Sequence, residues 1–304
     1  YAPDLVSHFS ARDVVAGIGN LSEDVLLLAD DDEGLSILDV SDLNNPVTID
    51  TQYQVNATNV GISGDYAAIG DASIGSNHIY FYNISSKTDI IPVGSVAIPG
   101  KMHDMDFEGS VVYAAEADTG VVIVDASDPS NPIHISTISD IGEAWSVDVV
   151  GSTLYVASGE NLFIYDVTDP AAPVKLYECP TDGIAKGIVA KDSVIYVGTE
   201  NSLQVFTLQN IPKKELAVKK TITDTQQMHY LDYTGDVLVA GSYYNDKFMF
   251  FDISDPLNPE IAYTYPLADH CSRIYANGSY VYGGHYNSSP RQGWLEIFDV
   301  TDPY

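Results

Sequence analysis

One string of residues recurs along this chain and constrains its fold more than any other feature. Each clear copy is a short apolar run that ends in Asp, followed after one residue by Ser or Thr, then Asp and usually Pro. A string that returns at a fixed spacing indicates a repeat architecture. The clear copies are GLSILDVSDLNNPV at 34–47, GVVIVDASDPSNPI at 120–133, NLFIYDVTDPAAPV at 161–174, KFMFFDISDPLNPE at 247–260 and WLEIFDVTDPY at 294–304, and the weaker ones are HIYFYNISS at 78–86 and SLQVFTLQNIP at 202–212.

Each repeat unit contains four short runs bounded by turn residues, which is the pattern of four consecutive strands. Seven units share the chain, at about 43 residues each, a period typical of propeller blades. We therefore predict an all-β, seven-bladed β-propeller with four antiparallel strands per blade, forming a single domain over 1–304. The expected blades are 11–53, 57–98, 102–138, 144–179, 185–222, 228–266, and 271–304 together with 2–9.

The two ends of the sequence complement each other. The last unit stops at DVTDPY and lacks a fourth run, whereas the chain opens with APDLVSHF at 2–9, which matches NPVTIDTQ at 45–52. We expect residues 2–9 to form the outer strand of the last blade. That pairing closes the ring without leaving an open sheet edge inside the seam.

The D-x-S/T-D-P pattern that ends most of the motif copies predicts a tight turn. An Asp at a strand end can accept backbone N–H bonds, and the following residues favour a turn. We therefore interpret Asp39, Asp42 and their equivalents as structural. A ring of Ca²⁺ loops is the alternative, but the oxygen-ligand spacing of a known Ca²⁺ loop is missing.

The charge balance excludes several classes of partner. Lys and Arg number 13 against 43 Asp and Glu, which gives a net charge of -30. Such a chain is not a nucleic-acid binder driven by phosphate contacts, and it is not expected to dock on anionic lipid. No apolar run reaches the roughly 18 residues of a membrane-spanning helix, so we predict no direct membrane insertion. Cys179 and Cys271 are too few for a disulfide framework and are expected to be free.

The motif GVVIVDASDPSNP resembles the LVIVD repeat, which occurs in secreted and surface-layer proteins of archaea and bacteria. The resemblance is strong in units one, three, four, six and seven. Asn83 and Thr207 replace the motif Asp in units two and five. It implies a propeller, an extracellular or cell-surface location and a display or binding role, and it carries over no catalytic residue.

One face of the expected propeller gathers unusual residues. The loops before the inner strands and between the second and third strands share this face, and all three arginines of the chain map to it. An arginine fork suits carboxylate or sulfate, and a ligand that also stacks on a tryptophan or tyrosine would bind best. The alternative is that these groups pair with local acids and seal the ring. The candidate ligand-binding residues are Arg12, His103, Trp145, Lys186, His229, Tyr230, Arg273, His285 and Arg291.

A metal site is a further possibility on this face. His103, His229 and His285 could converge with Glu116 or Asp71, although no His-x-x-x-His or Cys-x-x-Cys spacing supports it. We predict no cofactor, and a bound Ca²⁺ or other divalent cation stays as the alternative.

Two classes of function fit these features. The favoured one is a non-enzymatic binding or scaffold module that takes a surface glycan, a small polar ligand or an envelope protein at the channel mouth. The alternative is a polysaccharide-active enzyme, a uronate lyase or hydrolase. There Arg12 or Arg273 would neutralise the carboxylate, while His103, His229 or Tyr230 abstracts the proton. This alternative rests on analogy between folds.

Five N-x-S/T sequons bear on location. Apart from Asn83 they are expected in loops, where a glycan can be attached. Together with the acidic composition and the family resemblance, they favour an extracellular or cell-surface protein. The sequons begin at Asn20, Asn56, Asn83, Asn277 and Asn287.

Overall fold

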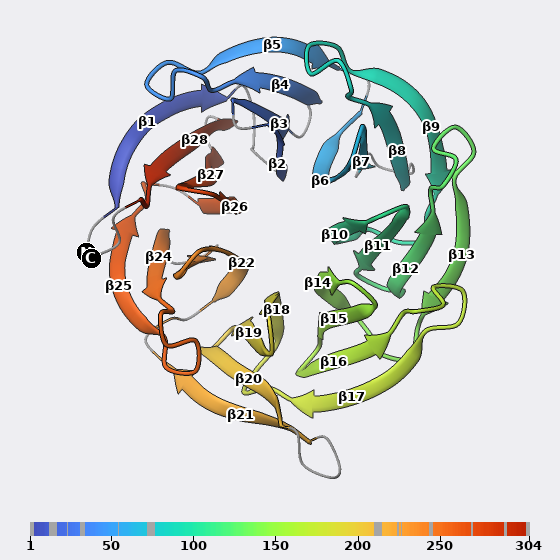
Figure 1. Ribbon diagram of the computed structural model, residues 1–304, viewed down its shortest axis with the longest axis vertical. Coiled ribbons are helices and arrows are strands. Elements are labelled where there is room, and N and C mark those ends of the chain that lie inside the picture. Colours follow the sequence, from blue (N-terminus) through green and yellow to red (C-terminus); the bar gives the residue numbers. More distant parts are fainter. Residues whose placement is uncertain are drawn as a thin grey trace.

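A ring of sheets surrounds a central channel in the computed structural model (Figure 1). Every regular element in the part of the chain that the structure describes is a β-strand, so no helix there could cross a membrane. The described residues are 3–11, 17–22, 24–30, 34–53, 55–71, 77–209, 215–223, 225, 227–242, 246–268, 270–288 and 291–301.

Within these ranges the strands form seven four-stranded antiparallel sheets, and each is one blade. The seven-bladed prediction is therefore confirmed. Blades one to three are β2 (Gly17–Ser22), β3 (Val25–Ala29), β4 (Leu35–Asp39) and β5 (Val47–Gln52); β6 (Ala57–Ser63), β7 (Tyr66–Asp71), β8 (His78–Asn83) and β9 (Ile91–Ala97); and β10 (Met102–Glu108), β11 (Val111–Glu116), β12 (Gly120–Asp125) and β13 (Ile133–Ile138).

The remaining blades follow the same order from the channel outward. They are β14 (Ala144–Val150), β15 (Thr153–Ser158), β16 (Asn161–Asp166) and β17 (Val174–Pro180); β18 (Ala185–Lys191), β19 (Val194–Thr199), β20 (Leu203–Gln209) and β21 (Glu215–Ile222); β22 (Met228–Thr234), β23 (Val237–Ser242), β24 (Lys247–Asp252) and β25 (Glu260–Pro266); and β26 (His270–Asn277), β27 (Tyr280–Ser288), β28 (Arg291–Asp299) and β1 (Asp4–Ala11).

The seventh blade takes its outer strand from the start of the chain. β1 pairs antiparallel with β28, from Asp4 opposite Asp299 to Ala11 opposite Gly293. Figure 1 shows the two strands side by side at the seam of the ring. The expected closure by the N-terminal strand is confirmed, and the pairing gives blade seven the four strands of the other blades.

The motif turns follow their predicted chemistry. Asp125 Oδ1 accepts the N–H of Ser127 at 2.8 Å, and Asp128 Oδ1 accepts the N–H of Ser130 at 3.1 Å. In blade two Asn83 Oδ1 accepts the N–H of Ser85 at 3.0 Å, so the amide replaces the carboxylate without loss of the bond. These turns lie at the ends of the third strands that lead to the outer strands, away from the channel mouth.

The apolar core lies between the blades. Each pair of neighbouring sheets encloses one cluster of buried side chains, such as Ile123 of β12 with Val156 of β15 and Phe163 of β16. The motif strand β12 is buried along residues 120–124, which explains its unbroken apolar run. This packing holds the inner strands in a closed circle and leaves their channel-facing side chains to form the site.

Candidate ligand site in the central channel

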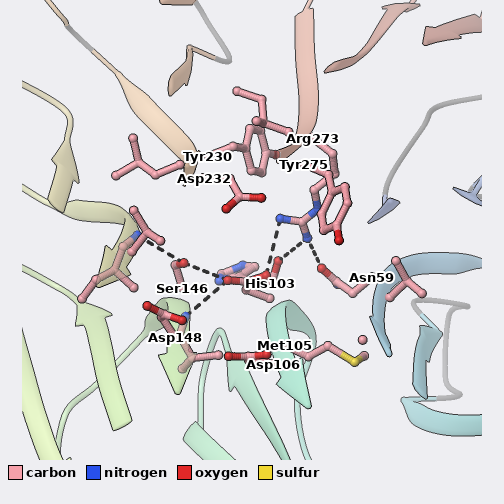
Figure 2. Close-up of a pocket in the computed structure, with 18 of the residues that line it drawn as sticks. Asn59, His103, Met105, Asp106, Ser146, Asp148, Tyr230, Asp232, Arg273 and Tyr275 are labelled. Carbon is pink, nitrogen blue, oxygen red and sulfur yellow. Dashed lines mark hydrogen bonds and ion pairs between the residues drawn. The ribbon is translucent and has the colours of Figure 1, made fainter. Parts of the chain in front are cut away.

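The channel holds a cavity of about 420 Å³. Its walls come from the inner strands of all seven blades, β2, β6, β10, β14, β18, β22 and β26. Figure 2 shows the side chains of several of these strands pointing toward the centre. A cavity of this size is within the usual range for small-molecule sites.

A β-bulge shapes the mouth of the cavity. In six described inner strands the register shifts near the start of the strand, after the first pair in five of them and after the second pair in β26. A bulge leaves one extra residue unpaired and redirects its side chain. The bulged residues are Thr58, His103, Trp145, Lys186, His229 and Ser272, and four of them are among the candidate residues that the sequence suggested.

Three of these residues form a stack across blades three to five. The His103 ring lies parallel to the Trp145 ring, with centroids 4.1 Å apart and 14° between planes. The Lys186 Nζ lies 3.0 Å from the centroid of the Trp145 ring, a cation–π contact. Two contacts this short cannot share one face, so both faces of the indole are covered. In this arrangement only the edge of Trp145 is open to a ligand, and stacking of a ligand on a tyrosine stays a prediction.

Two hydrogen-bond donors in this stack have no acceptor in the described structure. The Trp145 Nε1–H is buried without a partner. Lys186 is 8% exposed, and no described carboxylate lies within ion-pair distance of its ammonium. Burial lowers the pKa of Lys186, because a charge is poorly solvated there. The more distant charges of Glu200 and then Glu143 partly offset this effect. Buried donors normally have partners, so these two donors stand out at the mouth.

The two histidines of the mouth are neutral near pH 7. Burial lowers the pKa of His103, whose Nδ1 lies 3.0 Å from the Ala144 carbonyl oxygen. Burial, with the nearby Lys186 and then His103, lowers the pKa of His229 to about 4. His229 also meets the Trp145 ring edge-to-face at 6.3 Å. Lys186 therefore supplies the positive charge on this side of the mouth.

Arg273 spans the channel on the opposite side. Its Nη2 donates to the side chain of Asn59 and, at 2.9 Å, to the carbonyl of His103. Its Nη1 lies 3.6 Å from Asp104 Oδ1, and its Cζ lies 5.0 Å from the centroid of the Tyr230 ring. The guanidinium thus joins blade seven to blades two and three (Figure 2).

A second level of the channel lies deeper and is acidic. Asp106, Asp148 and Asp232 each accept a main-chain N–H of the next blade at 2.6–2.8 Å. Burial raises the pKa of these carboxyls to about 6, 8 and 7 respectively. The sequence reasoning missed this level. It could have found it, because Asp recurs three residues after the bulged position in units three, four and six.

The structure brings most of the predicted site residues together. His103, Trp145, Lys186, His229, Tyr230 and Arg273 all line the cavity. Arg12 lies outside the described residues. Arg291, the first residue of β28, pairs with Ser288 of β27, and its side chain lies outside the described part. Whether the six lining residues bind a ligand stays a prediction.

His285 does not join them. It lies on β27, the second strand of its blade, where its Nε2 is 3.2 Å from Glu296 Oε1 and its ring stacks on Trp294 at 5.2 Å. Second strands face neighbouring sheets rather than the channel, which is why the side chain is only 4% exposed.

The proposed metal set is not assembled. Glu116 Oε2 instead accepts the N–H of Gly100 at 2.9 Å. Within the described residues no three His, Cys, Asp or Glu side chains are placed to hold an ion. Cys179 and Cys271 are free, as expected.

Several sequons lie in β-strands, whereas loops were expected. Asn20 lies within β2, Asn287 lies within β27, and Asn277 is the exposed last residue of β26. The backbone at these positions is extended and forms part of a sheet, so these sequons do not indicate loops.

Comparison with known proteins agrees with the repeat and the fold. The LVIVD repeat matches residues 11–51, 56–79, 99–140 and 141–181. No curated protein matches the chain.

The solved structures that resemble this chain are propellers. The β-propeller domain of Cps50 (Swd1) from Myceliophteria thermophila has a TM-score of 0.76 and 12% identity, covering 99% of this chain and 100% of that one. The WD40 β-propeller domain of Doa1 has a TM-score of 0.75 and 9% identity over 97% and 96%. Saccharomyces cerevisiae Sqt1 has a TM-score of 0.69 and 10% identity over 100% and 87%. At these identities the likeness shows the fold alone.

Proposed function

Because this chain belongs to the LVIVD-repeat proteins, we propose that it is a binding module whose ligand occupies the mouth of the central channel. The propeller and its repeats support a binding or scaffold role. The ligand we propose is a surface glycan or a small polar molecule, and an envelope protein is the other candidate. The location we propose is extracellular or at the cell surface.

One observation carries the choice of the channel mouth. Trp145 and Lys186 both line the cavity, and neither the indole N–H nor the buried ammonium has a hydrogen-bond acceptor in the described structure. An unpaired buried donor costs about 1–3 kcal/mol, and more when it is charged. A ligand with acceptor atoms would offset that cost. If these side chains served only to fill the channel, acceptors for both donors would be expected among the neighbouring residues.

Cleavage of uronate polymers is less well supported by the same geometry. Arg273 is already bonded to Asn59, His103 and Asp104, so it would have to leave them to meet a substrate carboxylate. His229, with a pKa of about 4, is a weak base for proton abstraction. Release of an unsaturated sugar that absorbs in the ultraviolet would nevertheless replace binding by lyase chemistry.

An array of glycans and surface proteins tests the proposal. We expect the full chain to retain one class of probe, and His229→Ala and Tyr230→Ala at the mouth to weaken that binding at least about tenfold. Lys175→Met is the matched control, because Lys175 lies on the outer strand β17 and pairs with Glu178 there. Binding that survives both mouth variants would place the ligand elsewhere and overturn the proposal. Protease treatment of intact cells tests the location, and a fully protected protein would contradict it.

A further inference from the structure

We infer that the ligand of the channel mouth is a hydroxylated carboxylic acid, such as a sugar acid, whose carboxylate binds between the Lys186 ammonium and the Trp145 N–H. This inference rests on the proposed function and names the chemical class that the site selects.

The two donors, the Lys186 ammonium and the Trp145 N–H, favour an anionic ligand group. An ammonium has three donors and no acceptor, and an indole N–H is a donor only. Lys186 is 8% exposed with no described carboxylate in ion-pair distance, and the Trp145 Nε1 is buried without an acceptor. A carboxylate has two oxygens and can accept from both donors. Its bonds would be charge-assisted, which makes them stronger than bonds between neutral groups.

The stack around Trp145 holds these two donors in a fixed position. His103 and Lys186 cover the two faces of the indole, at 4.1 and 3.0 Å from its centroid. The N–H therefore remains at the edge, and the ammonium stays against the ring rather than extending into water. A donor pair fixed in this way needs little reordering on binding, which favours affinity for a small anion.

The deeper level sets the nature of the rest of the ligand. Asp148 lies three residues beyond Trp145 on β14, about 10 Å further along the channel at the strand rise. Its Oδ2 accepts the Ala190 N–H, and Asp106 and Asp232 line the same level. Carboxyl oxygens accept hydrogen bonds from hydroxyl groups whether the carboxyl is neutral or ionised, and a second carboxylate of the ligand would be repelled by those that are ionised. Hydroxyl groups several bonds away from the ligand's carboxylate fit this level, whereas an α-amino acid carries its ammonium on the adjacent carbon and does not span the distance.

Calorimetric titration of the full chain tests the ligand class. The probes are D-glucuronate and D-galacturonate, with D-glucuronamide and D-glucose as neutral analogues and benzoate as a carboxylate without hydroxyls. We expect a uronate to bind at least about tenfold more tightly than every comparator. Equal binding of glucuronate and glucuronamide, or tighter binding of benzoate, overturns the inference.

Matched variants test the two donors. Lys186→Met removes the ammonium and keeps the chain length, and should weaken uronate binding at least about tenfold. Trp145→Phe keeps an aromatic face without the N–H and should weaken it several-fold, while Lys175→Met should change nothing. Thermal melting checks folding, and Lys186→Gln serves if Lys186→Met does not fold. Uronate binding unchanged in both Lys186 and Trp145 variants overturns the inference.

The outcomes separate this inference from the proposed function. Suppose that the array finds a neutral or protein ligand, that the His229 and Tyr230 variants no longer bind it, and that uronates do not bind. The proposed binding function is then supported and the inferred ligand class is wrong. If ligands bind equally well to every mouth variant, the proposed function and the inferred ligand class are both wrong.

Discussion

Arg273 donates to the side chain of Asn59 across the channel, although 214 residues separate the two in the sequence. The same guanidinium reaches the carbonyl of His103 and the carboxylate of Asp104. One side chain thus ties blade seven to blades two and three, which are not its neighbours in the chain or in sheet pairing. A ring held mainly by contacts between adjacent blades gains from it a bond across its centre.

Replacement of Arg273 should loosen this cross-channel link. Arg273→Met removes hydrogen bonds from a mostly buried charge and leaves Asp104 without its cation, so we expect a loss of about 2–3 kcal/mol in the free energy of unfolding. Arg273→Lys should recover only part of it, because one ammonium cannot reach all three partners. Urea denaturation measures both. A free energy within about 0.5 kcal/mol of wild type for Arg273→Met would contradict the link.

Stability should fall as the pH rises. Asp106, Asp148 and Asp232 have pKa values of about 6, 8 and 7 in the folded chain, against a usual value of 3.8. Between those limits the folded state binds more protons than the unfolded state, so each group stabilises the fold at low pH and loses that contribution as the pH rises toward its folded pKa. The slope is at most about 1.4 kcal/mol per pH unit for each group.

Thermal melts at pH 5, 6.5 and 8 and constant ionic strength measure this effect. Asp148→Asn keeps an acceptor for the Ala190 N–H but cannot ionise, so its melting temperature should decline less between pH 5 and pH 8. Asp128→Asn, in an exposed turn, is the control and should follow the wild type. A wild-type melting temperature that is flat or rises over this range would show that the acidic level does not titrate as proposed.

Added salt should stabilise the protein. The net charge of -30 repels itself in the compact state, and salt screens this repulsion over about 10 Å at 0.1 M. We expect the melting temperature to increase from low salt to 0.5 M NaCl at fixed pH. A decrease would mean that attractive pairs such as Lys191 with Asp236 outweigh the repulsion.

The turn carboxylates can be tested one at a time. Asp125→Ala removes the acceptor for the Ser127 N–H and should lower the free energy of unfolding by about 1 kcal/mol. Asp125→Asn should be nearly neutral, because Asn83 already makes the same bond in blade two. Urea denaturation of both variants decides the point. Equal losses would assign the effect to the negative charge rather than to the hydrogen bond.

Removal of the N-terminal strand should open the ring. Deletion of residues 1–11 takes β1 away from β28 and leaves a three-stranded blade with an exposed edge. We expect a melting temperature lower by at least about 10 °C, together with self-association that can be followed by light scattering. An unchanged melt would show that the seam contributes little to the stability of the fold.

The fold could be predicted from the sequence because its signal is repeated. Five of the seven copies place the same Asp at the end of a buried strand, Asn83 and Thr207 stand there in the other two, and the spacing of the copies gives the number of blades. The ring at the mouth was also predictable, because one bulge at a constant position places Trp145 and Lys186 alike. The sequence does not show contacts between blades that lie across the ring from each other. The width of the channel decides which faces of Trp145 are covered and how far Arg273 reaches. The position of His285 is decided by packing against a neighbouring sheet.

The pairing of β1 with β28 also has a mechanical consequence. Asp4 lies opposite Asp299, so the first and last described strands meet at one end of the same ladder. A force that pulls these two ends apart would load the hydrogen bonds one after another, as in a zipper, rather than all together in shear. Under tension the seventh blade would therefore yield first, at low force, and the other six would lose their closed ring only after the seam had peeled open.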